Sequence, residues 1–313
     1  MEAEAVEMTA PLFVGVLAGA ILSATSLLYA TLGETLVERG GIVNLGLEGI
    51  LLVGASVGFA VTVASGSPWL GVLAAAGAGG LANALFGWLV VIRKANQLAS
   101  GLAMMFFGIG VSALVGGPYV GAVIAGLPKW RPSFLAALPW VKSTTLFNYD
   151  ILVWCAVPVA LLVWWVLFRT RWGLGLRAVG ESPVAAFAAG RNPALLQFQA
   201  LVAGGMLGGL GGAHLSLSLT LTWAEGMTAG RGFIAIALVI FSKWHPVRAL
   251  AGALLFGGAE ALQLQLQARG AAISPFLLDM IPYVLTLLVL LAWGGARRLA
   301  APAALGRTFY GSE

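Results

Sequence analysis

Residues 33–55 read GETLVERGGIVNLGLEGILLVGA and place charged and amide side chains just before a long apolar run. These side chains are Glu34, Glu38, Arg39, Asn44 and Glu48. An apolar run of this kind predicts a helix in a lipid bilayer, where an ionised side chain costs roughly 2.5–3.5 kcal/mol even on the mildest insertion scale. Polar groups at such a position therefore need a partner or a water-filled path.

The composition of the whole chain supports a polytopic membrane protein. Of its 313 residues, 60% are hydrophobic and 9% are charged, and the mean hydropathy is +0.95, whereas soluble domains are about 25% charged. The acidic start of the chain lacks the basic region of a signal peptide, so we expect the first apolar run to be kept as a span. We predict an all-α integral membrane protein in which residues 1–313 form a single transmembrane domain.

Turn-forming residues divide the chain into about nine predicted transmembrane helices, with eight to ten as the range. These lie near residues 11–32, 41–65, 68–92, 98–117, 149–168, 194–219, 231–243, 248–267 and 275–294. The run at 231–243 is short, so we expect it to be tilted or to cross only part of the bilayer.

Basic residues indicate the orientation of these helices. If the N-terminus lies outside, the inner segments hold twelve Lys and Arg residues and the outer segments hold five. The outer five are Lys129, Arg131, Lys142, Arg231 and Arg269. Because cytoplasmic segments are enriched in Lys and Arg, this distribution predicts an N-out, C-in topology. Glu34, Glu38 and Arg39 are then expected in the cytoplasmic turn between the first two helices, where water or a partner can satisfy them.

Two connections stand out by their length. The outer one, at about 118–148, contains several prolines and tryptophans and is expected to lie at the membrane surface. The inner one, at about 170–193, is basic and glycine-rich. Within it, Ser182 is a candidate N-cap for a short helix with Pro183 at its first position.

Several kinds of chemistry are excluded by missing motifs. The sequence has no P-loop, no His-Glu-x-x-His, no Cys-x-x-Cys and no Gly-x-Ser-x-Gly. We therefore expect no catalytic residue, no metal site and no cofactor in this chain. No basic patch is interleaved with exposed aromatic residues, so nucleic-acid binding is not expected.

Two glycine and histidine features are predicted to be structural. Gly204, Gly208 and Gly212 repeat at four-residue spacing, which favours close packing of helices. His214 and His245 lack acidic or thiol neighbours in the sequence and are expected to be packing or interfacial residues.

The remaining intramembrane polar groups are candidates for a transport path. Asn44 and Glu48 share one helical face and are flanked by glycines, which predicts a broken second helix beside a cavity. Glu260 and Gln263 share one face of the eighth predicted helix, and Asp279 is a further acidic residue of this kind. Two roles are possible for the helix face that carries Glu260. It can form hydrogen bonds to neighbouring helices, or it can line a path for a hydroxyl-rich or amide-rich solute.

Three separated segments carry a resemblance to a known family. They are ERGGIVNLGLEGILLVGA at 38–55, LRAVGESPVAAFAAGRNP at 176–193 and GRGFIAIALVIFSKWHPVRALAGALLFGGAEALQ at 230–263. Together they resemble permease subunits of the ABC importers for simple sugars and nucleosides, within the superfamily that includes the branched-chain amino acid and ribose systems. The chain length resembles the smaller permease of nucleoside systems, while Arg191 and Asn192 stand where the family pattern has an apolar residue.

This resemblance implies partners that the residues alone do not reveal. These are a second homologous permease in a heterodimer, cytoplasmic ABC ATPase subunits that bind the ATP and Mg²⁺, and an extracytoplasmic substrate-binding lipoprotein. It also implies a multi-pass location among the lipids of a bacterial plasma (inner) membrane. The residues expected to couple to the ATPase are Glu181, Ser182, Pro183, Ala185, Ala186, Phe187 and Gly190.

The substrate is expected to be a small polar solute. Nucleosides are the first candidate, simple sugars the second, and riboflavin-like heterocycles the third. A single-chain secondary transporter is an alternative, but it would need two similar halves and coupling charges in mid-membrane. A membrane-embedded enzyme would need ionisable residues clustered at one membrane face, and the acidic residues here are scattered.

Overall fold

The computed structural model describes residues 12–132, 146–270, 274–293 and 301–310, and it is all-helical over these ranges. Seven helices are long and apolar enough to cross a membrane. They are α2 (Leu12–Arg39), α3 (Leu47–Ser65), α4 (Pro68–Gly87) with its π-helical continuation η1 (Trp88–Ile92), α5 (Gln97–Gly116) with the 3-10 turn η2 (Gly117–Tyr119), α8 (Ile151–Arg169), α11 (Pro193–His214) with its π-helical continuation η3 (Leu215–Leu219), and α13 (Pro246–Ala268). The prediction of a multi-pass α-helical protein is confirmed.

Other helices are too short to cross, so nine crossing helices are not found in the described ranges. The helix α12 (Arg231–Phe241) has 11 residues, which rise about 16 Å at 1.5 Å per residue, against roughly 30 Å of hydrocarbon. The ninth predicted helix is divided into α14 (Pro275–Asp279) and α15 (Ile281–Trp293). Two further helices, α9 (Arg171–Glu181) and α10 (Pro183–Ala188), lie in the long basic connection.

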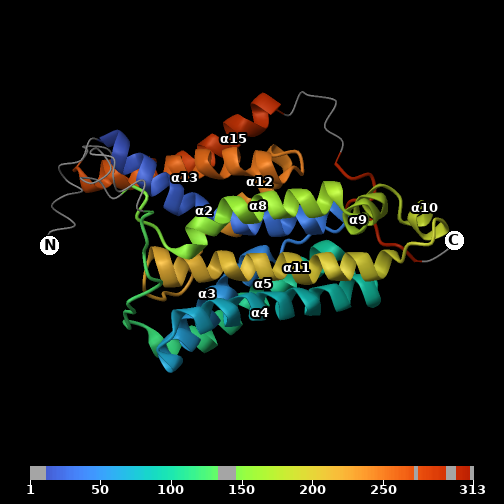
Figure 1. Ribbon diagram of the computed structural model, residues 1–313, viewed down its shortest axis with the longest axis horizontal. Coiled ribbons are helices and arrows are strands. Elements are labelled where there is room, and N and C mark those ends of the chain that lie inside the picture. The colour runs from blue at the N-terminus through green and yellow to red at the C-terminus, as the bar shows by residue number, and fades with distance from the viewer. Residues whose placement is uncertain (1–11, 133–145, 271–273, 294–300, 311–313) are drawn as a thin grey trace.

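The long helices run side by side, with α11 among α2, α3 and α4 (Figure 1). On the other side of α2 lie α12 and α13, and α15 packs against both of them. The connections predicted to be cytoplasmic meet at one end of the bundle, near α9 and α10. There the Arg39 guanidinium donates hydrogen bonds to the carbonyl oxygens of Trp244, at 3.0 Å, and Lys243, at 3.3 Å. The N-out, C-in orientation itself stays a prediction.

Glycines allow α11 to approach α2 and α3 very closely. A Cβ atom on Gly204 would lie 2.7 Å from the carbonyl oxygen of Gly33, and one on Gly212 would lie 2.1 Å from that of Leu51. Any larger residue at either position would force the helices apart, because backbone atoms cannot give way as a flexible side chain does. The predicted role of the Gly204, Gly208 and Gly212 repeat in close packing is confirmed.

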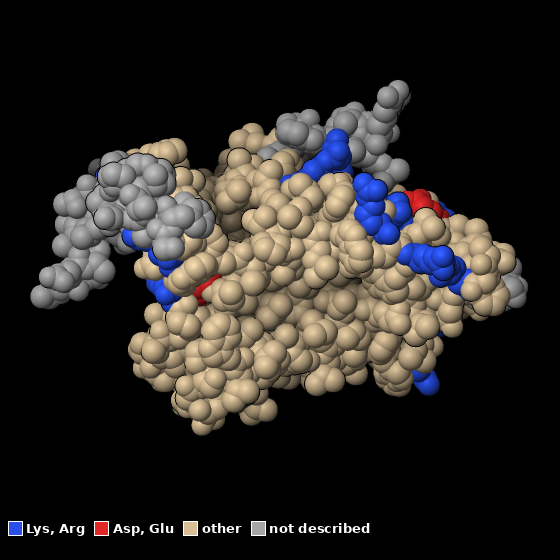
Figure 2. Space-filling model, viewed as in Figure 1, with Lys and Arg blue, Asp and Glu red and all other residues tan. Residues whose placement is uncertain are grey.

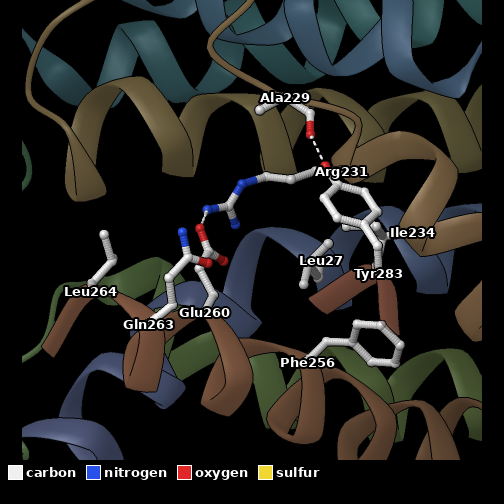
Figure 3. Close-up of a pocket in the computed structure, with 9 residues that line it drawn as sticks. All are labelled: Leu27, Ala229, Arg231, Ile234, Phe256, Glu260, Gln263, Leu264 and Tyr283. Atoms are coloured by element: carbon white, nitrogen blue, oxygen red, sulfur yellow. Dashed lines mark hydrogen bonds and ion pairs between the residues drawn. The ribbon is translucent and has the colours of Figure 1, made fainter. Parts of the chain in front are cut away.

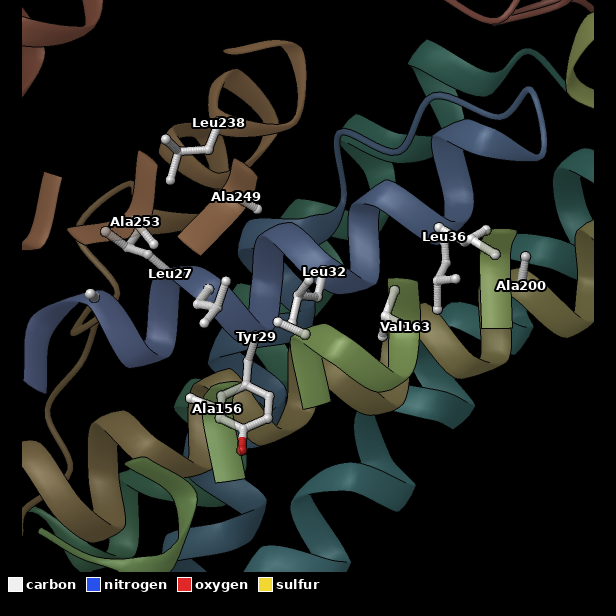
Figure 4. Close-up of a cluster of buried hydrophobic side chains, with 14 of the residues drawn as sticks. Leu27, Tyr29, Leu32, Leu36, Ala156, Val163, Ala200, Leu238, Ala249 and Ala253 are labelled. Atoms are coloured by element: carbon white, nitrogen blue, oxygen red, sulfur yellow. The ribbon is translucent and has the colours of Figure 1, made fainter. Parts of the chain in front are cut away.

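The largest hydrophobic cluster surrounds α2 (Figure 4). Leu27, Leu32 and Leu36 on this helix are buried. They pack with residues of α8, α11 and α13 that include Ala156, Val163, Ala200, Ala249 and Ala253. The Tyr29 hydroxyl, in the same cluster, donates a 2.9 Å hydrogen bond to the Leu152 carbonyl oxygen of α8. This satisfies the polar tip of a ring that is otherwise held in apolar surroundings.

The start of the quoted stretch differs from expectation. Glu34 and Glu38 lie inside α2 and are 1% and 3% exposed, so the prediction that they lie in a turn is wrong for both. The helix continues to Arg39 before the chain turns, and Trp244 donates its indole N–H to Glu38 Oε2. Glu34 lies beside Asn44, but neither carboxylate oxygen has a hydrogen-bond partner of good geometry among the described residues.

The predicted break in the second helix is not found inside α3. This helix is continuous from Leu47 to Ser65, and the non-helical backbone is confined to residues 40–46 before it. Gly41 has a φ of +86°, a left-handed conformation that favours glycine and that turns the chain out of α2. Of the predicted outer loop, residues 133–145 lie outside the described ranges.

Candidate functional site

The carboxylate of Glu48 connects the first and third signature segments of the sequence. Its Oε1 accepts hydrogen bonds from the Thr228 hydroxyl, at 2.6 Å, and from the Gly230 backbone N–H, at 2.8 Å. Its Oε2 accepts one from the Gly232 N–H, at 2.6 Å. The side chain is buried at 7% exposure, and a negative charge at a helix N-terminus is stabilised by the helix dipole. Glu48 therefore caps α12 from the neighbouring helix α3.

Glycine is needed at this junction. A Cβ atom on Gly232 would lie 2.5 Å from the backbone nitrogen of Glu48, so any other residue would push α12 away from α3. Gly230, at the start of α12, has a φ of +82°. This left-handed turn brings the chain into the short helix. The two glycines and Glu48 together fix where α12 begins.

Arg231, the first residue of α12, points into a pocket between α2, α12, α13 and α15 (Figure 3). Its guanidinium forms an ion pair with Glu260 on α13. It also donates hydrogen bonds to the Ser26 hydroxyl, at 3.0 Å, and to the Ser23 carbonyl oxygen, at 3.3 Å, both on α2. One cation thereby joins three helices, and its charge is neutralised within the bundle.

The pocket combines polar and apolar walls. It has a volume of about 310 Å³, at the lower end of the range of about 300–1,000 Å³ for small-molecule sites. Its lining residues are Leu27, Ala229, Arg231, Ile234, Phe256, Glu260, Gln263, Leu264 and Tyr283. The Tyr283 hydroxyl donates a 3.1 Å hydrogen bond to the Ala229 carbonyl oxygen. A guanidinium, a carboxylate and an amide beside aromatic rings suit a solute that carries both hydroxyl groups and a flat apolar face.

The two predicted pairs of pathway residues lie in different surroundings. Glu260 and Gln263 line the pocket together, as their shared helical face predicts. Asn44 is 1% exposed and does not line it. The Asn44 amide group donates to Asn83 Oδ1 at 3.1 Å, and its oxygen accepts the Gly46 N–H at 2.9 Å. The structure thus places Asn44, like Glu48, in contacts that hold α3 to its neighbours.

The predicted short helix in the basic connection is confirmed as α10. Ser182 caps it by accepting the Ala185 N–H at 3.2 Å, and Pro183 occupies its first position. Phe187 is half-exposed, whereas Ala186 is buried against its own chain at 3% exposure. Ala186 consequently does not belong to the accessible face of α10.

The ends of α10 are held by neighbouring segments. Glu181 accepts a hydrogen bond from the Ala303 N–H at 3.3 Å. Gly190 has a φ of +78°, which suits the turn that follows the helix. The preceding helix α9 was not predicted from the sequence. Its Arg177 side chain donates a 3.1 Å hydrogen bond to the Leu167 carbonyl oxygen, which fixes α9 to the end of α8.

Sequence reasoning missed two pocket residues, Arg231 and Tyr283. Arg231 was assigned to an outer segment, yet it is the first residue of an 11-residue, mostly apolar helix that is too short to cross the membrane. A cation beside so short a run signals a charge at membrane depth, and its partner had to be an acidic residue such as Glu260. No comparable signal marks Tyr283. For Asp279, the side chain lies outside the described structure.

The histidines and acidic residues do not assemble into a metal site in the described ranges. His214 is fully buried, and neither ring nitrogen has a hydrogen-bond partner among the described atoms. His245 stacks on Phe168 with ring centroids 5.3 Å apart. Partial burial and the nearby Arg248 and Arg39 guanidinium groups lower the pKa of His245, which favours the neutral ring expected of a packing residue.

Comparisons with known proteins agree with this architecture. The family described as "Branched-chain amino acid transport system / permease component" matches residues 16–290. A proposed glucose ABC transporter permease of Haloferax volcanii is 40% identical over 83% of this chain and 80% of its own. A nucleoside ABC transporter permease of Lactococcus lactis is 35% identical over 95% of this chain and 97% of its own. A guanosine ABC transporter permease of Bacillus subtilis is 31% identical over 91% and 93%, respectively.

Proposed function

Because this chain belongs to the family of ABC transporter permease components, we propose that it forms the membrane path through which an ATP-driven importer takes up nucleosides. It is a multi-pass membrane protein and a transport subunit. The observation that supports a path in this chain is the pocket in which Arg231, Glu260 and Gln263 meet Tyr283. Intramembrane charges of this kind normally line a substrate or ion pathway.

The chemistry of the pocket suits a nucleoside. Its ribose hydroxyl groups can donate to Glu260 and accept from Gln263, and its base has a flat face for Phe256 or Tyr283. The relatives named for nucleoside and guanosine transport cover more than nine tenths of this chain. In this reading, Glu48 borders the path indirectly, because it fixes the end of α12 from which Arg231 projects. Asn44 acts one step further away, because it holds the start of α3 against Asn83 of α4.

A simple sugar is the second candidate. The relative proposed to transport glucose has the higher identity, 40%, over a smaller share of this chain. The hydroxyl groups of a hexose would contact Glu260 and Gln263 in the same way. Phe256 or Tyr283 would then stack on the sugar ring. The two candidates therefore differ in whether the flat heterocyclic base is required.

Energy is supplied by partner subunits in this proposal. The sequence has no P-loop, so ATP and Mg²⁺ bind to cytoplasmic ATPase subunits that dock on α10. A second homologous permease completes the path as a heterodimer, and an extracytoplasmic lipoprotein delivers the solute to the outer side of the plasma membrane. Because Ala186 is buried, Val184, Ala185 and Phe187 form the accessible part of this contact.

Uptake by the assembled transporter tests the substrate assignment. We expect radiolabelled guanosine or uridine to be imported, and excess unlabelled nucleoside to block this import while excess glucose does not. Glu260→Gln should lower nucleoside uptake at least about tenfold, since it weakens a contact to a charged group worth about 1.5–3 kcal/mol. Gln263→Ala should lower it by about twofold to tenfold, since a neutral hydrogen bond is worth about 0.5–1.5 kcal/mol.

The matched control is Gln265→Ala, which changes the same residue type on the same helix outside the pocket lining. It should leave uptake unchanged. Normal uptake by both pocket variants would show that the pocket is not part of the transport path. Import of glucose but not of nucleosides would select the second candidate instead.

A further inference from the structure

Residues 301–310, here called the C-terminal segment, lie across the end of the bundle that carries α9 and α10. The Ala304 N–H donates to the Gly180 carbonyl oxygen of α9 at 2.9 Å. The Gly306 N–H donates to the Gly41 carbonyl oxygen, in the turn between α2 and α3, at 3.0 Å. Ala304 is 4% exposed, so the segment is packed into this end of the protein.

The C-terminal segment also reaches the turn between α4 and α5. The Gln97 amide donates to the Arg307 carbonyl oxygen at 3.5 Å and accepts the Val43 N–H at 2.9 Å. The Lys94 ammonium group lies 6.0 Å from the ring centroid of Phe309, within the range of a cation–π contact. Two turns of the bundle and the helix α9 are therefore tied together by one segment.

An exposed aromatic surface joins the C-terminal segment to α10. The ring centroids of Phe309 and Phe187 are 6.0 Å apart, a usual distance for an aromatic pair. Tyr310 is 69% exposed, and Val184 and Phe187 are each 50% exposed. These four residues, called the aromatic patch, come from two segments that are more than a hundred residues apart in the sequence.

We propose that the aromatic patch is one composite docking surface for the ABC ATPase subunit, to which the C-terminal segment contributes as much as α10. This proposal rests on the function proposed above. Interfaces commonly have aromatic residues at the centre and a polar rim. Here Lys94 lies beside Phe309, and Arg191 and Arg307 are close to the patch in the sequence. Lys and Arg side chains also gather toward this end of the molecule, and a broad uncharged area covers its middle (Figure 2).

The contacts give this surface a mechanical role. A force applied to α10 alone would act on a helix of six residues. Through the C-terminal segment, the same force reaches Gly41, Val43 and Gln97, and so the inner ends of α2, α3 and α5. An ATPase bound to both segments would therefore move several membrane helices together.

Site-specific photo-crosslinking tests whether the ATPase touches both segments. A benzoylphenylalanine residue replaces Tyr310, Phe187 or Trp69 in the full-length chain, and the probe is the purified ABC ATPase subunit of the same transporter. Trp69 is a matched control because it is 49% exposed at the start of α4, whose other end continues through η1 to the turn that holds Lys94. We expect crosslinks to the ATPase from positions 310 and 187, and none from position 69.

The outcomes separate this proposal from the proposed function. Crosslinks from 187 alone would overturn the composite surface and leave the ATPase-driven function intact. No crosslink from either position would contradict the docking role of α10 as well. If position 310 crosslinks only to lipid, the aromatic patch contacts the membrane surface and not the ATPase, and the proposal is overturned.

A binding measurement provides a second, independent test. In nanodiscs of neutral phospholipid, Tyr310→Ala should weaken the affinity for the ATPase at least about tenfold, as expected for an aromatic interface anchor. Trp69→Ala should leave it unchanged. Because Tyr310 is largely exposed, its removal should not unfold the subunit, so unchanged affinity of the Tyr310→Ala protein would overturn the proposal.

Discussion

The backbone nitrogen of Gly232 lies 2.6 Å from the Oε2 atom of Glu48, so a carboxylate of α3 is directly bonded to the first turn of α12. The neighbouring residue, Arg231, extends from the same turn to Glu260 on α13. The position of the Arg231 guanidinium in the pocket thus depends on a hydrogen bond made by the next residue, in the same first turn of α12. The first turn of α12 therefore both holds α12 to α3 and supplies a charged group to the pocket.

Removal of the Glu48 carboxylate should destabilise this junction. Glu48→Ala leaves the Thr228 hydroxyl and two backbone N–H groups without their acceptor, and we expect the free energy of unfolding to fall by about 3 kcal/mol. Glu48→Gln keeps one oxygen and should cost less. Thermal unfolding of the purified chain measures both effects, with Glu225→Ala as a control at an exposed glutamate. Equal melting temperatures for Glu48→Ala and Glu225→Ala would show that the cap is dispensable.

The Arg231–Glu260 ion pair should behave as a coupled unit. Arg231→Met leaves the Glu260 charge unpaired, and Glu260→Met leaves that of Arg231. Since Glu260 is 26% exposed, we expect each change to lower the free energy of unfolding by about 3 kcal/mol, the lower end for a buried pair. The double variant should lose much less than the sum, because no uncompensated charge remains. Additive losses in a double-mutant cycle would argue against the pairing.

Gly209 on α11 should not tolerate even a methyl group. A Cβ atom there would lie 2.1 Å from the Ala75 carbonyl oxygen of α4, so Gly209→Ala should lower the free energy of unfolding by about 1–3 kcal/mol. Gly77→Ala, on α4, is the matched control because no described heavy atom lies within 4 Å of its added Cβ. This change should be neutral or stabilising by about 0.5–1 kcal/mol. Similar melting temperatures for the two variants would contradict the close helix contact.

His245 should make stability depend on pH in the acidic range. Its pKa in the folded protein is lowered, first by burial and then by Arg248 and Arg39, whereas the unfolded chain has a His pKa of about 6.5. Above pH 6.5 both states are neutral at this residue. As the pH falls below 6.5, the unfolded state takes up the proton first, so the folded state is destabilised. Thermal unfolding from pH 7.5 to 5 should show a smaller loss for His245→Gln, and identical curves would rule out this contribution.

Local patterns predicted much of the fold. The cap of α10 was predicted because Ser182, Pro183 and the N–H that Ser182 accepts lie within four consecutive residues. Close packing around Gly204 was predicted because small residues at fixed spacing have few other uses in an apolar helix. The pairing of Glu260 with Gln263 in one pocket followed from helical periodicity.

The contacts that were not predicted have one physical cause: the two residues of each contact lie far apart in the sequence. Glu48 and Thr228 are separated by 180 residues, so nothing near Glu48 in the sequence reveals that its oxygens bond to α12. Glu38 was expected in a turn, with either water or a partner around it. Its partner, the Trp244 indole, is brought to it by a different part of the chain. Arg231 was counted as an outer charge because nothing near it in the sequence reveals its partners. These are Ser26 on α2 and Glu260 on α13.

The hydrogen bond from Gly306 to Gly41 also orders the events of biosynthesis. The Gly41 carbonyl oxygen emerges from the ribosome early, and its partner is made only after α15. Until then the ends of α2 and α3 next to Gly41 lack this closure, and the aromatic patch lacks the two residues Phe309 and Tyr310. If the aromatic patch binds the ATPase as proposed, a chain that has not finished inserting its helices presents no complete docking surface, and we expect the transporter to assemble only after the membrane part has been made.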